Sequence, residues 1–265
     1  MVIRLMVVVL MSCLLTACQQ PSGSTQYSIG DRTYHLYRPA DLADPAPLVV
    51  FLHGGFGTGE QAEKTYGWDA EADAGHFLVA YPDGVDRAWN TGGGCCGVPA
   101  RDGVDDVGFI TAMVTAISRT APVDPHKVYA SGMSNGGIMA YTLACHTTIF
   151  AAIGPGSATQ LGDCPSPKPL SVIHIHGTAD HNVPYDGGVG DGVASIDGPS
   201  APALDAQWRA VDKCPPPTVS TAGTSTTSVA SCPDGLRVEL ISVAGMGHRW
   251  APGATHTMWR FFSRS

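Results

Sequence analysis

Continuous apolar runs and periodic apolar positions alternate along most of the chain. Runs without a polar interruption at 48–52 and 77–81 are typical of strands buried on both faces of a sheet. Shorter runs predict further strands at 127–130, 151–153, 170–175 and 236–243, preceded by a hairpin at 27–29 and 33–37. Apolar residues three or four positions apart predict helices over 107–118, 138–145, 204–211 and 255–262.

This order of elements predicts an α/β fold, with a mainly parallel sheet and helices on both of its faces. The sequence shows neither an internal repeat nor a second domain. The segment 215–231 is rich in Pro, Thr and Ser and is not expected to belong to the core. The Gly-rich segment 186–199 has two interpretations, a mobile lip over a site or a long surface loop.

The first residues are predicted to serve export and not the fold. A short basic start at Arg4 precedes an apolar stretch, 5–15, which has the length of a signal peptide's apolar region. The sequence 15–18, Leu-Thr-Ala-Cys, resembles the lipobox of bacterial lipoproteins, in which cleavage precedes a Cys that becomes lipidated, here Cys18. The alternative is an ordinary secretory signal cut near Ala17.

We therefore expect three segments: a lipoprotein signal peptide at 1–17, a lipidated Cys and flexible tether at 18–25, and one catalytic domain at 26–265. The protein would be exported, and either anchored by lipid to the outward face of the cell membrane or secreted. Lipid is the only membrane attachment expected, and the domain is expected to be a monomer.

Composition and charge exclude several classes of function. Charged residues make up only 14% of the chain, and Gly and Pro are abundant, at 32 and 20 residues, which predicts many turns and long loops. The net charge is −8, and it becomes −9 once Arg4 leaves with the signal. A binder of polyanions would normally carry a basic field, so nucleic acid is not expected as a partner.

The cysteines indicate disulfides. Without Cys13 and Cys18, an even set of six remains, which in an exported protein suggests three disulfides: Cys95, Cys96, Cys145, Cys164, Cys214 and Cys232. Cys214 and Cys232 flank the polar segment and are a plausible local pair. Cys95 and Cys96 could form a vicinal disulfide, although we favour separate partners. A metal site has weak support, because no Cys pair lies near His176 and His181, so no metal is expected.

The sequence Gly-Met-Ser-Asn-Gly at 132–136 stands between a predicted strand and a predicted helix. That setting distinguishes a nucleophile elbow from a chance match, because a sharp strand-to-helix turn exposes the serine oxygen. We expect Ser134 to be the nucleophile. The glycine-rich loop at 53–57 follows the first buried strand, and its backbone N–H groups could bind an oxyanion. The expected donors are the N–H groups of Gly55 and Asn135.

A serine nucleophile needs a base and an acid that orients the base. Asp180 follows the strand at 170–175 and His248 follows the strand at 236–243, at the carboxyl ends where an open parallel sheet builds its site. We expect these two to be the acid and the base. The rival acids are Asp186 and Asp191, and the rival base is His256. His174, His176 and His181 are expected to shape the loop that carries the acid.

Two tryptophans and two further acids have weaker claims to a role in the site. Trp250 could form an apolar wall of the substrate site, or it could pack the loop that carries the base. Trp89 could line the site or brace the turn at Cys95 and Cys96. Asp105 and Asp106 are expected to cap a helix and to fix the turn at Cys95 and Cys96, and not to catalyse.

With these motifs in place, the chain resembles the esterase/polyhydroxybutyrate-depolymerase family, which is related to feruloyl and acetylxylan esterases. The residues that carry the resemblance span about 50 to 252 and stand at 52–55, 89–90 with 95–97, 105–109, 132–136, 176–180 with 183–185, and 247–250. The resemblance implies an alpha/beta-hydrolase fold and hydrolysis of carboxylic esters by Ser134, His248 and Asp180. It implies no metal and no organic cofactor.

The expected partner is an ester: a small molecule, a polysaccharide-linked acyl group or a polyester oligomer. The first expectation is a serine esterase for feruloyl, acetyl or hydroxyalkanoate esters. A polyhydroxybutyrate depolymerase proper, an acyltransferase of the cell envelope and a non-catalytic binding lipoprotein are the alternatives. The complete set of Ser, Asp and His argues against the last of these.

Overall fold

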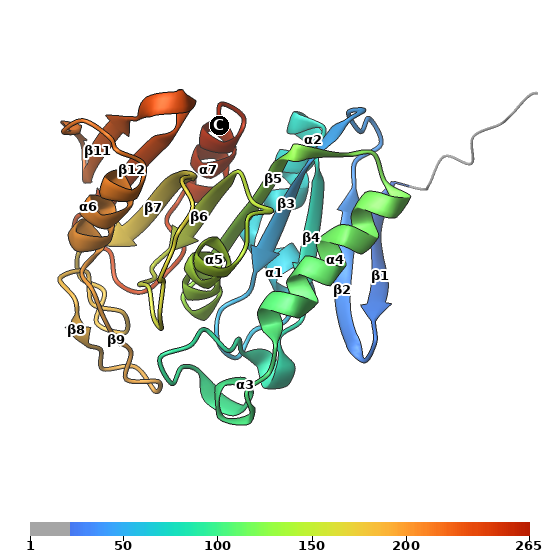
Figure 1. Ribbon diagram of the computed structural model, residues 1–265, viewed down its shortest axis with the longest axis horizontal. Helices are drawn as coiled ribbons and strands as arrows, with labels where there is room; N and C mark the ends of the chain where they lie inside the picture. The colour runs from blue at the N-terminus through green and yellow to red at the C-terminus, as the bar shows by residue number, and fades with distance from the viewer. Residues whose placement is uncertain (1–21) are drawn as a thin grey trace, which may run out of the picture.

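The computed structural model describes residues 22–265 (Figure 1). The expected signal peptide, lipidation at Cys18 and the start of the tether therefore lie outside the described residues. The main strands are β1 (Gly23–Ile29), β2 (Arg32–Arg38), β3 (Ala46–Leu52), β4 (Leu78–Pro82), β5 (Val123–Met133), β6 (Ala152–Gly156), β7 (Ser171–Gly177), β10 (Thr218–Ala222), β11 (Ser225–Ser231) and β12 (Arg237–Val243). Because β1 begins at Gly23, the sheet already includes the last residues of the predicted tether, 23–25.

Across the described residues these strands form one ten-stranded sheet in the order β1-β2-β4-β3-β5-β6-β7-β12-β11-β10. The strands from β4 to β12 run parallel to one another, and an antiparallel pair extends the sheet at each edge. The prediction of a mainly parallel α/β sheet is confirmed.

The helices lie on both faces of the sheet, as Figure 1 shows. They are α1 (Gly59–Tyr66), α2 (Trp68–Gly75), α3 (Gly97–Asp102), α4 (Asp106–Thr120), α5 (Asn135–His146), α6 (Ala201–Val211) and α7 (Ala254–Phe262). On one face, α4, α5 and α6 cover a core that includes Leu48 and Val50. On the other face, α1, α2 and α7 lie over a core that includes Val49 and Phe51. Alternation along β3 thus supplies both cores, as a strand buried on both faces requires.

Three helices and one hairpin were missing from the sequence prediction. The helices α1, α2 and α3 are short, and α1 and α2 are separated by a single left-handed residue, Gly67. The polar segment 215–231 lies outside the core, as expected, but it forms the hairpin of β10 and β11 at the sheet edge. Its side chains are mostly exposed, so no apolar pattern marks the strands.

The described cysteines form three disulfides: Cys95–Cys96, Cys145–Cys164 and Cys214–Cys232. The local Cys214–Cys232 pair is confirmed. The expectation that Cys95 and Cys96 take separate partners is wrong, because the other four cysteines pair among themselves across 19 and 18 positions.

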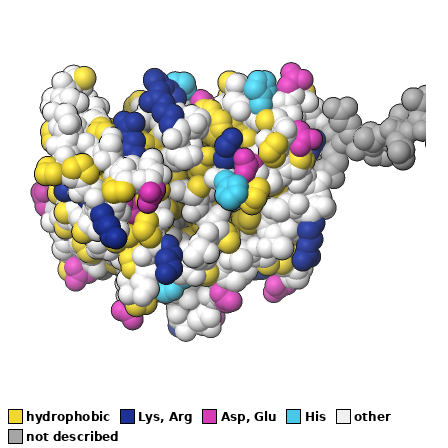
Figure 2. Space-filling model, turned by 45° about the horizontal axis from the view of Figure 1, so that its top comes forward, with side chains coloured by type: hydrophobic (Ala, Val, Ile, Leu, Met, Phe, Trp, Pro, Cys, Tyr) yellow, Lys and Arg dark blue, Asp and Glu magenta, His cyan; other side chains and the backbone are white. Residues whose placement is uncertain are grey.

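The part of the chain that the structure describes contains no helix that is both long and apolar enough to cross a membrane. Figure 2, which brings the top of Figure 1 forward, shows Lys and Arg side chains in separate groups among uncharged and apolar ones, without one continuous basic field.

Candidate active site

The serine elbow has the strained backbone that the sequence predicted. Ser134 stands between β5 and α5 with φ 55° and ψ −122°, and its N–H donates to Gly156 O at 2.9 Å. A Cβ atom at Gly136 would collide with the backbone of Leu52 in the neighbouring strand, so glycine is required there. The elbow thus depends on close packing of β5, β3 and α5.

The structure brings Ser134, His248 and Asp180 together. His248 Nε2 lies 2.8 Å from Ser134 Oγ, and His248 Nδ1 lies 2.8 Å from Asp180 Oδ2. Because Asp180 accepts the proton on Nδ1, Nε2 is free to accept the serine proton. In the sequence, His248 is 114 positions from Ser134 and 68 positions from Asp180. All three residues follow the carboxyl ends of parallel strands.

The loops that carry the acid and the base are joined by backbone hydrogen bonds. Thr178 N donates to Val243 O at 3.0 Å, and Ala179 N donates to Met246 O at 3.0 Å. Gly245 N donates to the Thr178 hydroxyl at 3.0 Å. The distance between Asp180 and His248 is therefore set by backbone and not by long side chains.

Asp180 is buried and accepts from several donors. Its Oδ1 accepts the N–H groups of Asn182 at 2.9 Å and Val183 at 3.0 Å, and its Oδ2 also lies 3.3 Å from His176 Nε2. Burial alone would raise the pKa of Asp180, but the hydrogen bonds from His176, His248 and Val183 outweigh it and lower the pKa below its ordinary value. The carboxyl group is therefore ionised at neutral pH.

Behind the acid, a buried chain of side chains runs away from the site. His176 Nε2 contacts Val183 O at 2.9 Å, His174 Nε2 lies 3.0 Å from His176 Nδ1, and Tyr141 OH lies 3.1 Å from His174 Nδ1. Burial lowers the pKa of His174. The two histidines thus support the acid loop, as expected, but the participation of Tyr141, from α5, was missed. Nothing in the apolar pattern of that helix distinguishes it.

The predicted rivals lie elsewhere. His256, the rival base, is exposed on α7 and pairs with Glu71 at 3.0 Å. Asp186 and Asp191 are exposed, and within residues 22–265 neither carboxylate pairs with a histidine ring; Asp191 contacts His181 only through its backbone N–H, which donates to His181 O at 2.7 Å. The geometry thus favours Asp180 and His248 over all three.

The two expected oxyanion donors lie side by side. A Cβ atom on Gly55 would lie 4.0 Å from Asn135 Cβ, and both residues line the cavity that contains Ser134 and His248. Neither backbone N–H group has a hydrogen-bond partner within the described part of the chain, whereas the next N–H, that of Phe56, donates to Arg87 O at 2.8 Å. Two residues that line the cavity beside the serine therefore carry backbone donors without a partner among the described residues.

The cavity has a volume of about 380 Å³, within the range of small-molecule sites. Its apolar lining comprises Phe56, Val98, Ile138, Val183, Val193 and Ile196, and Cys96 of the vicinal disulfide also lines it. The segment 186–199 contributes part of this lining and contains the short paired strands β8 (Gly188–Val189) and β9 (Asp197–Gly198). Of its two interpretations, a position over the site is the one that the structure supports.

Neither predicted tryptophan lines this cavity. Trp89 is fully buried, and its indole N–H donates to His53 O at 2.8 Å. Trp250 packs edge-on against Phe51 and Tyr66, and it belongs to the packing of the loop after the base. The substrate-lining roles proposed for both are corrected to structural ones, because neighbouring aromatic groups and backbone occupy their faces.

Within residues 22–265, the candidate set of metal ligands is Asp212, Cys214 and Cys232. Both sulfurs are joined in a disulfide, so the thiolates that would bind a metal are not available.

Known proteins resemble this chain in sequence and in fold. The family model for Esterase PHB depolymerase matches residues 32–203. "Putative esterase NocK" from Nocardia uniformis subsp. tsuyamanensis is 36% identical over 84% of this chain and 72% of its own length. Feruloyl esterase B from Piromyces equi is 30% identical over 78% of this chain, but the match spans only 40% of that protein.

Among solved structures, the acetyl xylan esterase from Aspergillus awamori superposes with a TM-score of 0.68, covering 91% of this chain and 100% of that one at 17% identity. An S-formylglutathione hydrolase from Agrobacterium tumefaciens superposes with a TM-score of 0.60 at 12% identity, covering 93% and 97%. These two likenesses concern the fold, which is that of the alpha/beta-hydrolases. The chain belongs to the Esterase PHB depolymerase family and is a carboxylic ester hydrolase.

Proposed function

We propose that the chain is an exported, lipid-anchored serine esterase that acts through Ser134, His248 and Asp180 and an acyl-enzyme. The observation that carries this proposal is the continuous hydrogen-bonded series from Ser134 Oγ through His248 to Asp180 beside the cavity. A hydroxyl, a base and an orienting acid in that order are what nucleophilic acyl transfer requires.

In the first half of the reaction, His248 Nε2 takes the proton of Ser134 as the oxygen attacks the ester carbonyl. Asp180 stabilises the imidazolium that forms, and its low pKa keeps it ionised while it does so. The N–H groups of Gly55 and Asn135 stabilise the oxyanion. His248 then gives its proton to the leaving alcohol, and the acyl group stays on Ser134.

In the second half, water attacks the acyl-enzyme. His248 again acts as the base, now toward the water, and the same two N–H groups stabilise the second oxyanion. The acid is released and Ser134 regains its proton, so the cycle needs no other reactant.

The proposed substrates are esters with a small or aromatic acyl group, of the acetyl and feruloyl type. The size of the cavity and its largely apolar lining support this proposal, because they suit an acyl group of up to aromatic size, although Asp86 and Arg87 also line the cavity. The name of one relative, feruloyl esterase B, supports the same class.

Anchoring at Cys18 is proposed on the sequence at 15–18, and the three disulfides support export because they persist in oxidising compartments. Fatty-acid labelling of the expressed full chain should be lost in Cys18→Ser. Labelling that survives in this variant would refute lipidation at this residue.

The catalytic proposal is tested with Ser134→Ala and with Ser195→Ala as a matched control, since Ser195 is an exposed serine close to the cavity lining. Loss of the nucleophile should reduce kcat by several orders of magnitude, while the control should hydrolyse p-nitrophenyl acetate like the wild type. Methyl ferulate, acetylxylan and hydroxybutyrate oligomers would then rank the acyl groups. Normal turnover by pure Ser134→Ala would overturn the proposal.

A further inference from the structure

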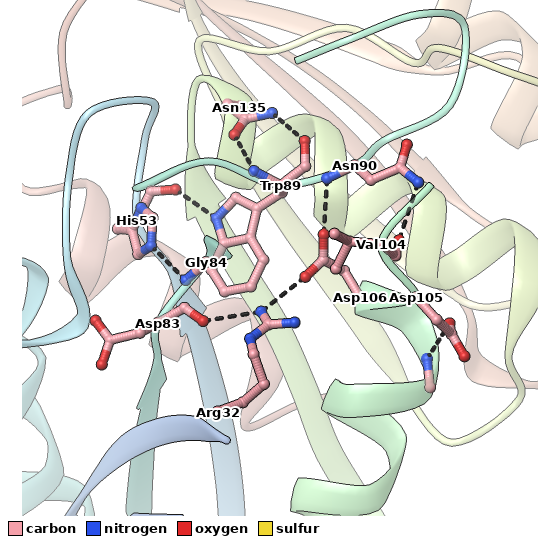
Figure 3. A network of polar contacts seen from close by, with 11 residues as sticks. Arg32, His53, Asp83, Gly84, Trp89, Asn90, Val104, Asp105, Asp106 and Asn135 are labelled. Atoms are coloured by element: carbon pink, nitrogen blue, oxygen red, sulfur yellow. Dashed lines mark hydrogen bonds and ion pairs between the residues drawn. The ribbon is translucent and has the colours of Figure 1, made fainter. Parts of the chain in front are cut away.

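Asp106 is an acid in an unusual place. It opens α4, but it is only 1% exposed, whereas its neighbour Asp105 caps the same helix from outside by accepting Gly108 N at 2.7 Å. Asp106 turns inward, where Oδ1 accepts Arg32 Nη2 at 2.7 Å and Oδ2 accepts the backbone N–H of Asn90 at 2.7 Å (Figure 3).

The Arg32 side chain is itself held from two further sides. Its guanidinium donates to Asp83 O at 2.9 Å and lies 4.1 Å from the centre of the Phe109 ring. A buried ion pair contributes little net stability, because both groups lose their hydration. Stability is therefore a weak explanation for the burial of this pair. The hydrogen bond from the Asn90 backbone to Asp106 is a better explanation, because it holds the 89–90 segment in place.

That backbone leads directly to the elbow. Asn90 follows Trp89. The backbone N–H of Trp89 donates to Asn135 Oδ1 at 2.8 Å, and the backbone C=O of Trp89 accepts Asn135 Nδ2 at 3.1 Å. The Asn135 side chain is thus held by two bonds to one residue of the 89–90 segment. Its own backbone N–H is one of the two proposed oxyanion donors, so the position of that N–H depends on where Trp89 lies.

The same segment leads to the second donor. Trp89 Nε1 donates to His53 O at 2.8 Å, and His53 Nε2 accepts Gly84 N at 2.9 Å. With Nε2 an acceptor, Nδ1 carries the proton and donates to Gly54 O at 2.8 Å. C=O and N–H point in opposite directions in a trans peptide, so a fixed Gly54 carbonyl aims the Gly55 N–H.

The contacts close into a ring, which Figure 3 shows from Arg32 through Asp106, the 89–90 segment and His53 to Gly84 and back through Asp83. We infer that Asp106, held by Arg32, is a positioning residue for the oxyanion hole, because it fixes the 89–90 segment on which both N–H donors depend. Asp106 lines no part of the cavity and contacts neither Ser134, Asp180 nor His248. This inference rests on the proposed function.

The test compares Asp106→Asn with Asp105→Asn. The two acids are neighbours in the sequence, but only Asp106 belongs to the ring of contacts. An amide at position 106 must turn its NH₂ toward either Arg32 or the Asn90 N–H, so one of the two contacts is lost. Removal of a whole oxyanion donor lowers kcat by roughly 10²- to 10³-fold. Displacement of the two N–H donors without their removal should therefore lower kcat by about 10- to 30-fold and change KM by less than about threefold. Asp105→Asn should retain wild-type kcat.

Two readouts separate positioning from a merely structural role. Inhibition by a trifluoromethyl ketone, which binds as an oxyanion adduct, should weaken in parallel with kcat. The pH dependence of kcat/KM should keep its shape, since the ring does not contact His248. Trp89→Phe, which removes the bond to His53 O and part of the buried indole but keeps the backbone bonds to Asn135, is the second variant if Asp106→Asn folds poorly, and it should show a smaller loss of the same kind.

All variants are assayed below their melting temperatures, with Ser134→Ala as the reference for loss of the reaction itself. Wild-type kcat and ketone affinity in both Asp106→Asn and Trp89→Phe, in an enzyme that Ser134→Ala inactivates, would overturn the inference and leave the proposed function intact. Normal turnover by Ser134→Ala would overturn the proposed function instead.

Discussion

Replacement of Asp180 by Asn tests the orientation of the base more sharply than a truncation does. Oδ1 of Asp180 accepts two backbone N–H groups, those of Asn182 and Val183. The amide of Asp180→Asn must therefore place its C=O there and its NH₂ toward His248, because the reverse orientation would set a donor against two donors. Each unsatisfied buried donor costs about 1–3 kcal/mol, so the orientation is fixed.

An NH₂ group facing His248 Nδ1 changes the tautomer of the imidazole. Nδ1 becomes the acceptor, the proton moves to Nε2, and Nε2 no longer accepts the proton of Ser134. We expect kcat/KM to fall by about 10³- to 10⁴-fold, which corresponds to roughly 4–5.5 kcal/mol of transition-state stabilisation. The melting temperature should fall, because the bonds to Asn182 and Val183 are kept but an NH₂ group cannot accept from His176 Nε2, which lies 3.3 Å from Oδ2 of Asp180.

The assay is hydrolysis of p-nitrophenyl acetate by purified variants at neutral pH. Asp186→Asn is the matched control, since Asp186 is an exposed acid six positions further along the same loop. The control should keep wild-type kcat/KM. Retention of more than about a tenth of the activity by Asp180→Asn, or an equal loss in Asp186→Asn, would refute the reasoning.

Three more predictions follow from the structure. His248→Asn should abolish ester hydrolysis, and His256→Gln should leave it intact; the reverse result would reassign the base. Burial raises the pKa of Asp212 from 3.8 to about 7, against the lowering effect of the Leu170 N–H, so the folded state binds a proton that the unfolded chain releases. Stability should therefore fall as pH rises from about 4 to about 7, by at most ~1.4 kcal/mol per pH unit. Denaturant unfolding should show a flatter profile for Asp212→Asn, and an unchanged slope would contradict the assignment. Paired Ser replacements of Cys214 and Cys232 should cost about 3 kcal/mol and lower Tm by roughly 6–12 °C, with activity kept at low temperature; an unchanged Tm in a thermal scan would contradict this.

The sequence predicted the parts of the fold whose signals are local. A strand buried on both faces needs an uninterrupted apolar run, and β3 and β4 have one. The glycines at 132 and 136, between a strand and a helix, placed the elbow. Because the carboxyl ends of parallel strands meet at one edge, a residue following β7 and one following β12 could be expected beside it.

Pairings between distant segments could not be predicted in the same way. Arg32 and Asp106 are 74 positions apart, and before folding each has the pattern of an ordinary surface charge. The sequence left Trp89 with two interpretations, lining the site or bracing the turn at Cys95 and Cys96, because burial depends on the loops around it. The structure favours the second, since Trp89 is fully buried and its C=O accepts Cys96 N at 3.2 Å. The strands β10 and β11 lack an apolar face, so periodicity had nothing to detect.

The central claim is that Ser134 is the nucleophile of this esterase. The most direct measurement is mass-spectrometric mapping of the wild-type protein after reaction with a fluorophosphonate probe. We predict one adduct, on the peptide that contains Ser134, and no adduct on Ser134→Ala. An adduct on another residue, or an unlabelled wild-type enzyme that still hydrolyses p-nitrophenyl acetate, would contradict the claim.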